Sequence, residues 1–134
     1  MTKKILVVDD SFVMRALIKS LVDADLRLEV VGEASNGKEA LTMTQQLNPD
    51  VILLDIEMPE MDGIEFMKRA KLLTPAKIII ISSVVDGGSE PLEQVRQLGA
   101  FAVIEKPSGS MSLDLEQKRG HEIVKALRSA TGLQ

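Results

Sequence analysis

The sequence predicts an α/β fold in which helices cover a parallel sheet. Short apolar runs alternate with longer segments of helical period along the chain, and this alternation is typical of such folds. Most of the runs are rich in Ile, Leu and Val without polar alternation, as in strands that are buried on both faces. At 134 residues, the chain is long enough for one hydrophobic core. We therefore expect one domain with five strands.

The first half of the chain is predicted to contain three strands and two helices. Residues 5–8, 30–31 and 51–54 are the apolar runs. After the first run, Ser11 can cap a helix whose apolar residues, up to position 22, recur at helical spacing. The second helix is expected from about residue 36 to residue 47, because an Asn-Pro pair follows it.

The second half continues the alternation with three helices and two strands. A third helix is expected from Asp62-Gly63 up to the break at Thr74-Pro75, before a strand at 78–81. Ser89 can cap a short fourth helix that ends at Gly99, before a strand at 102–104. The final helix, at about 114–129, is amphipathic and is expected to pack on the sheet edge.

Composition excludes several classes of function. The net charge is −4, Trp and Tyr are absent, and only three residues are Phe, which argues against direct binding of nucleic acid. The absence of cysteine excludes disulfide scaffolds and cysteine zinc sites. No apolar run approaches the length of a membrane span. We therefore expect a cytoplasmic protein without membrane insertion.

Reactive polar residues follow several of the predicted strands. Asp9 and Asp10 follow the first strand, Asp55 the third, Ser82 the fourth and Lys106 the fifth. In open α/β sheets, ligands bind outside the carboxyl ends of the strands. If the strand order is 2-1-3-4-5, the first and third strands are neighbours and the three acids converge.

Three converging carboxylates would repel one another unless a cation neutralised them. A set of oxygen ligands without His or Cys suits a hard cation, and Mg²⁺ best. A carboxylate can also attack phosphorus and form an aspartyl phosphate, while a metal ion and a lysine stabilise the transferring oxygens. Asp55, Mg²⁺, Lys106 and Ser82 would supply these parts.

Four motifs containing these residues occur in one order over roughly residues 3–130: Val7-Val8-Asp9-Asp10-Ser11, Leu54-Asp55-Ile56-Glu57-Met58-Pro59 with Met61-Asp62-Gly63, Ile81-Ser82-Ser83, and Lys106-Pro107. They resemble the response-regulator receiver family, the phospho-accepting domains of two-component signalling. The resemblance implies a flavodoxin-like, doubly wound five-stranded parallel sheet of order 2-1-3-4-5 with five helices. It also implies a receiver domain at 1–130, followed by a tail at 131–134 that could begin a linker to an output domain.

The resemblance implies a role for each acid. Asp55 would accept the phosphoryl group from the phosphohistidine of a sensor histidine kinase. Asp10, Asp55 and the backbone carbonyl of Glu57 would bind Mg²⁺, and Asp9 would act directly or through water. The Glu57 side chain itself could be a solvated loop acid or could lie beside the phosphoryl group.

The resemblance also implies a switch. Lys106 would pair with the phosphoryl oxygens, and Ser82, rather than Ser83, would be the hydroxyl that moves toward them. Many receivers have a Tyr or Phe three residues before the lysine, where this chain has Val103. Phe101 lies two positions earlier, on the same side of the strand by alternation, so it could substitute for that aromatic residue.

The motifs around Asp55 and Ser82, and the segment at 106–115, look especially like the amino-terminal domain of chemotaxis protein-glutamate methylesterases (CheB). This implies a CheA-like kinase and an output domain or chemotaxis protein as partners. The chain has no G-x-S-x-G nucleophile motif, so we expect a regulatory domain rather than an enzyme. It would be either the excised regulatory domain of a methylesterase or a stand-alone relative.

A small Mg²⁺-dependent phosphatase with an aspartate nucleophile is the alternative. The pair Asp55-x-Glu57 is similar to the paired acids of such enzymes, although their second acid is normally Asp. Turnover of a phosphate ester would favour the phosphatase, and a single stoichiometric phosphorylation would favour the receiver.

Overall fold

The computed structural model describes residues 2–58, 60–83, 90–106 and 113–133, with the backbone alone at 113–119. Five strands form one sheet in the order β2-β1-β3-β4-β5, and every neighbouring pair is parallel. The strands are β1 (Lys3–Val8), β2 (Leu28–Ala34), β3 (Val51–Leu54), β4 (Lys77–Ser82) and β5 (Ala102–Glu105). The predicted fold class and strand order are confirmed.

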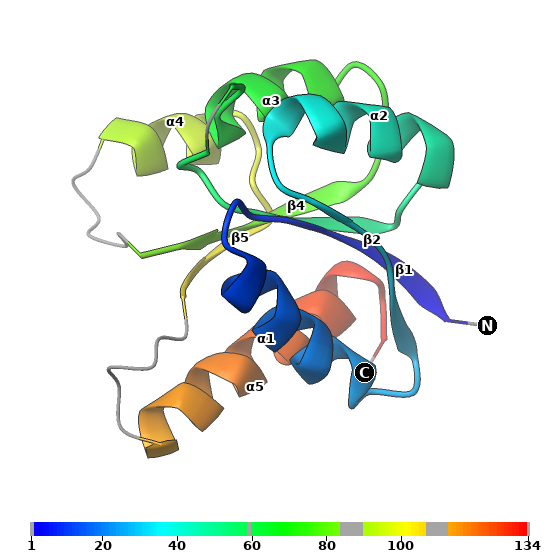
Figure 1. Ribbon diagram of the computed structural model, residues 1–134, viewed down its shortest axis with the longest axis vertical. Coiled ribbons are helices and arrows are strands. Elements are labelled where there is room, and N and C mark those ends of the chain that lie inside the picture. The colour runs from blue at the N-terminus through cyan, green and yellow to red at the C-terminus, as the bar shows by residue number, and fades with distance from the viewer. Residues whose placement is uncertain (1, 59, 84–89, 107–112, 134) are drawn as a thin grey trace.

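Helices cover both faces of the sheet. They are α1 (Phe12–Asp23), α2 (Gly37–Leu47), α3 (Gly63–Ala70), α4 (Glu90–Gln97) and α5 (Leu113–Ala130). Figure 1 shows α2, α3 and α4 on one face and α1 and α5 on the other. Ile123 and Leu127 of α5 are fully buried in the same cluster as residues of the central strands. The last helix therefore packs beside α1, against the edge strand β5 and its neighbour β4, which agrees with the predicted packing at the sheet edge.

Side-chain caps begin three helices where the sequence predicts them. Ser11, Asn36 and Asp62 each accept a hydrogen bond from the amide three residues later, at 3.2, 2.8 and 2.9 Å. These bonds satisfy amides that have no partner within the helix. Ser89 lies outside the described residues. Gly99, after α4, has a φ of +97°, which agrees with its predicted role as a left-handed terminator.

Helix α3 ends earlier than the Thr74-Pro75 break predicts, at Ala70. The amides of Leu72 and Leu73 bond to carbonyls three residues back, at 3.1 and 2.9 Å. The chain therefore tightens into turns before the proline is reached.

The core lies on both faces of the sheet. Along β1, β3 and β4, alternate side chains enter two separate apolar clusters, one under each layer of helices. This alternation explains why the strand runs are apolar throughout. In the described parts of the chain, no helix combines the length and apolar character needed to cross a membrane.

Candidate functional site

Three carboxylates meet at the carboxyl ends of β1 and β3. The register pairs Val8 with Leu54, so the residues that follow them, Asp9 and Asp55, lie side by side. The amide of Asp55 donates to the carbonyl of Val8 at 2.9 Å. Carboxylate oxygens of Asp9, Asp10 and Asp55 all lie within 4.8 Å of one another, and Asp10 is the exposed member.

Lys106 reaches this cluster from the end of β5. Its amide donates to the carbonyl of Ser82 at 2.9 Å, which fixes its main chain beside β4. Its Nζ lies 2.9 Å from Asp9 Oδ2 and 3.1 Å from Asp55 Oδ2. One ammonium thus serves two acids, while the third acid of the cluster faces solvent.

The cluster retains capacity for a cation. Asp9 is 1% exposed, and its Oδ2 accepts no hydrogen bond from the described residues. Its close charged neighbour is Lys106, which forms an ion pair with that oxygen at 2.9 Å. A buried carboxylate oxygen without a hydrogen bond is costly, and an all-oxygen set suits Mg²⁺. The residues therefore fit a magnesium ion, which would occupy the solvent side near Asp10.

The surroundings of Asp55 and Lys106 shift the pKa values of both groups. Burial, the largest effect, raises the pKa of Asp55 to about 6; Lys106 lowers it, and Asp9 raises it further. For Lys106, burial, the largest effect, lowers the pKa, but the nearby carboxylates of Asp9 and Asp55 outweigh it and raise the pKa. The ammonium therefore stays charged, and the carboxylate is destabilised.

Glu57 lies in the loop that follows Asp55, and Ser82 ends the neighbouring strand β4. The amide of Glu57 approaches Asp55 Oδ1 at 3.4 Å, while the Glu57 side chain is exposed. Ser82 is the last residue of β4 and is 4% exposed, whereas Ser83 is exposed. Val103 packs on the cluster beneath α2, α3 and α4.

Phe101 lies at the opposite edge of the sheet from the acids, which is the edge formed by the amino ends of the strands. It precedes β5, its amide donates to Ile78 at 2.8 Å, and Lys77 Nζ lies 5.0 Å from its ring centroid. It lines a shallow cavity with Glu122 and Lys125 of α5, whereas Val103 packs on the opposite face. The predicted shared side is wrong, because strand alternation begins only at residue 102.

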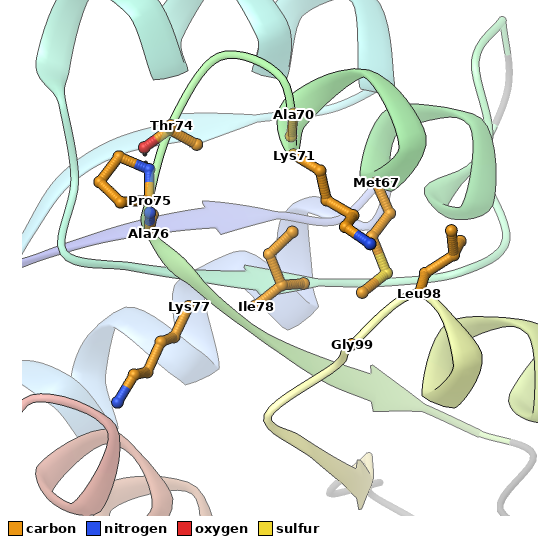
Figure 2. A pocket seen from close by; sticks show the side chains of 10 residues that line it. All are labelled: Met67, Ala70, Lys71, Thr74, Pro75, Ala76, Lys77, Ile78, Leu98 and Gly99. Atoms are coloured by element: carbon orange, nitrogen blue, oxygen red, sulfur yellow. Dashed lines mark hydrogen bonds between the residues drawn. The ribbon is translucent and has the colours of Figure 1, made fainter.

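A second hollow also lies at this opposite edge, where α3 ends and the α4–β5 connection passes β4. Figure 2 shows Lys71 beside Met67 in it, while the side chain of Lys77 points away. The strands separate this hollow from the acids, so it takes no part in their chemistry.

Two glycines that the sequence indicates only as helix starts pack closely on neighbouring main chain. A Cβ on Gly63 would lie 2.5 Å from the carbonyl oxygen of Asp55, and a Cβ on Gly37 would lie 2.4 Å from that of Met61. The start of α3 therefore packs directly on the main chain of Asp55. A glycine at the first position of a capped helix, where its φ freedom is not needed, is the signal that could have indicated this close approach.

Comparisons with known proteins agree with this geometry. A family model described as the response regulator receiver domain matches residues 5–118. A protein-glutamate methylesterase/protein-glutamine glutaminase of Halalkalibacterium halodurans is 53% identical over 116 residues, which cover 87% of this chain and 34% of the relative. The chain spans about a third of the length of the curated relatives it matches.

Solved structures are similar over nearly the whole chain. The response regulator domain of Thermotoga maritima CheB has a TM-score of 0.88 and 36% identity, and covers 100% of this chain and 99% of its own. The structure of the P1 domain of CheA3 in complex with CheY6 from R. sphaeroides gives a TM-score of 0.78 and 43% identity, with 97% of both chains covered. With an acid-rich strand edge on the same five-stranded fold, this chain belongs to the response regulator receiver domain family, a family of regulatory domains.

Proposed function

We propose that this chain accepts a phosphoryl group on Asp55 from the phosphohistidine of a sensor histidine kinase, and that the change controls an output. The observation that carries the proposal is the environment of Asp55: a buried carboxylate, 3.1 Å from Lys106 and clustered with two further acids. Such a carboxylate has one charged partner and few water molecules around it, which suits a nucleophile toward phosphorus.

The reaction is a transfer between two protein side chains. A bond forms between a carboxylate oxygen of Asp55 and phosphorus, the bond from phosphorus to the histidine nitrogen breaks, and its electron pair stays on the imidazole. With a pKa of about 6, Asp55 is mostly ionised at neutral pH and can act as the nucleophile.

Asp9, Asp10, Asp55 and the main-chain carbonyl of Glu57 would hold Mg²⁺. When bound, Mg²⁺ supplies positive charge that stabilises the oxygens of the transferring phosphoryl group. The buried Asp9 Oδ2, which accepts no hydrogen bond from the described residues, supports this assignment. The exposed position of Asp10 leaves the site open to the phosphodonor.

Lys106 and Ser82 would read the phosphorylated state. Lys106 Nζ is already 3.1 Å from Asp55 Oδ2 and would pair with a phosphoryl oxygen after transfer. Ser82, buried at the end of the neighbouring strand, would donate its hydroxyl to another. We propose that α4, β5 and α5 form the surface that this change biases, with Val103 leaving Ser82 as the main switching group.

The output belongs to chemotaxis in this proposal. The relative named above is a protein-glutamate methylesterase/protein-glutamine glutaminase, and a similar chain is the response regulator domain of a CheB. Residues 1–130 would form the receiver of a methylesterase-type regulator or of a stand-alone relative, and 131–134 would begin a connection to an output domain. A CheA-like kinase in the cytoplasm would be the phosphodonor; a CheA domain is seen with the similar CheY6.

Intact-mass analysis tests the assignment of Asp55. With a low-molecular-weight acyl phosphate and Mg²⁺, the wild type should gain one phosphate and Asp55→Asn none. Asp25→Asn is the matched control, since it changes an acid at the far edge of the sheet and should gain phosphate like the wild type. A wild type that gains no phosphate, or an Asp55→Asn variant that gains as much, contradicts the proposal.

A parallel reaction with a simple phosphate ester separates the receiver from the phosphatase alternative. The Glu57 side chain is exposed, and its amide is the group that approaches Asp55, which does not suit a general acid beside the nucleophile. We expect stoichiometric phosphorylation and no sustained turnover of a simple phosphate ester. Continuous release of inorganic phosphate from such an ester would favour the phosphatase.

A further inference from the structure

A second cationic side chain is fixed at the acid-rich edge. Arg15 lies in α1, and its side chain is 15% exposed. Its Nη1 donates a 2.7 Å hydrogen bond to the main-chain carbonyl of Asp9. Its Nε lies 3.5 Å from Glu33 Oε1, and its guanidinium carbon lies 5.8 Å from the ring centroid of Phe12. The guanidinium is thus held by a strand, a turn and its own helix.

Arg15 completes a set of contacts around Asp9. The amide of Asp9 donates to Ala34 at 3.0 Å, and its Oδ1 accepts from the amide of Ser11 at 2.8 Å. Its Oδ2 faces Lys106 at 2.9 Å. A cation bound by the acids would compete with Lys106 for Oδ2, but not with the other contacts. Those contacts therefore hold Asp9 in place whichever positive charge its carboxylate faces.

We propose that Arg15 is a positioning residue for the cation site. By holding the Asp9 carbonyl, it fixes the turn between β1 and α1 that carries both Asp9 and Asp10. Ligands that are already in place lose less conformational freedom when the metal binds, and groups that orient metal ligands contribute to metal affinity in the same way. This inference rests on the proposed function, because it assumes that the acids bind Mg²⁺.

Positioning and simple electrostatics predict opposite results. The guanidinium is positive and repels a cation, so a purely electrostatic role predicts tighter Mg²⁺ binding when the charge is removed. Positioning predicts weaker binding, because the Asp9 carbonyl loses its donor. Arg15→Gln removes the charge and shortens the reach, and Arg15→Lys keeps the charge but cannot hold the Asp9 carbonyl and Glu33 together with one planar group.

The experiment measures Mg²⁺ affinity separately from activity. Calorimetric titration of the unphosphorylated chain with MgCl₂ gives the dissociation constant, and phosphorylation by an acyl phosphate at saturating Mg²⁺ gives the maximal rate. For Arg15→Gln we expect a dissociation constant about tenfold higher, with a maximal rate close to that of the wild type. Arg15→Lys should fall between the two.

Arg128→Gln is the matched control. Arg128 also pairs with a carboxylate, that of Asp25 at 2.7 Å, and is 29% exposed, but it lies at the other edge of the sheet. This variant should lose stability and keep its Mg²⁺ affinity, as a purely structural arginine would.

The outcomes separate this inference from the proposed function. Equal or tighter Mg²⁺ binding by Arg15→Gln, beside a wild type that binds Mg²⁺, overturns the positioning role. Affinity in Arg15→Lys equal to that of the wild type overturns it as well, because the planar guanidinium that joins the Asp9 carbonyl to Glu33 would then not be needed. A wild type that neither binds Mg²⁺ nor accepts phosphate overturns the proposed function instead.

Discussion

Asp55 and Asp25 are carboxylates at opposite edges of the same sheet, and their surroundings shift their pKa values in opposite directions. The amide of Arg27 and the side chain of Arg128 lower the pKa of Asp25. Burial raises the pKa of Asp55 to about 6, even though Lys106 is close. Asp25 has donors of its own, whereas Asp55 shares one ammonium with Asp9.

The Asp25 pair and the Asp55 cluster therefore have different roles, the first in stability and the second in the proposed function. The Asp25–Arg128 pair joins the turn after α1 to the last turns of α5, 103 residues away, and so contributes to folding. Ionisation of the buried Asp55 opposes folding, and a cation bound by the cluster would offset this cost. The edge that is poorly neutralised by the protein itself is therefore the edge at which we propose that Mg²⁺ binds.

The largest predicted effect is a gain in stability on removing the Asp55 charge. A carboxyl with a raised pKa stabilises the folded state below its unfolded pKa of 3.8, and this contribution is lost as the pH rises through about 6. The cost at neutral pH is about 3 kcal/mol. Without Mg²⁺, Asp55→Asn should therefore be more stable than the wild type at pH 7.5, and the gain should shrink toward pH 4.5.

Urea unfolding followed by circular dichroism measures this gain, since the chain has no Trp or Tyr. A chelator keeps the acids free of metal during the measurement. A gain that does not change with pH would mean that the substitution acts through packing rather than through the Asp55 charge.

Mg²⁺ should offset the destabilisation that the Asp55 charge causes in the wild type. A ligand at ten times its dissociation constant stabilises the folded state by about 1.4 kcal/mol. We expect this increase in the unfolding free energy for the wild type and little or none for Asp10→Asn, which removes an exposed member of the cluster. Equal stabilisation of both by Mg²⁺ would place the ion elsewhere on the surface.

At the opposite edge, Asp25→Asn should destabilise the protein by about 1 kcal/mol, because a partly buried ion pair and its hydrogen bond are lost. A lowered pKa gives stability that is present above 3.8 and disappears as the pH falls through the folded value. The loss should therefore be constant between pH 5 and 8 and decline in acid, opposite in sign to the effect at Asp55. Urea unfolding across this range would detect either pattern.

Much of the fold could be predicted because its determinants are local. The helix starts at Ser11, Asn36 and Asp62 depend on side chains that bond three residues ahead. The strand runs depend on apolar composition. The end of α3 was predicted less well, because the turn bonds that close it do not follow from the position of the next proline.

In the candidate site, too, some features follow from local sequence and others depend on the assembled fold. Polar residues directly after apolar runs predicted that Asp9 and Asp55 would meet. Local pattern does not show that Lys106 pairs with both acids, because its contact with Asp55 crosses one strand and its contact with Asp9 crosses two. The position of Phe101 was missed because one residue decides whether the strand has begun, and that start depends on the turn at Gly99.

The smallest expected effects concern two phenylalanines, one at each edge of the sheet. Phe12 lies under Arg15 at the acid-rich edge, with 5.8 Å from the guanidinium carbon to the ring centroid. Phe101 lies under Lys77 at the opposite edge, at 5.0 Å. Both are substantially exposed, so replacing either by Leu should cost about 0.5 kcal/mol of stability.

Only Phe12→Leu should change Mg²⁺ binding. Loss of the ring lets Arg15 move away from the Asp9 carbonyl, so the dissociation constant should rise about twofold, the equivalent of the lost contact energy. Phe101→Leu should leave Mg²⁺ affinity and phosphorylation unchanged, because its cation lies far from the acids. Calorimetric titration of both variants with MgCl₂ decides the point. An effect of Phe101→Leu on phosphorylation would show that the two edges are coupled through the sheet, and would restore this aromatic residue to the switch.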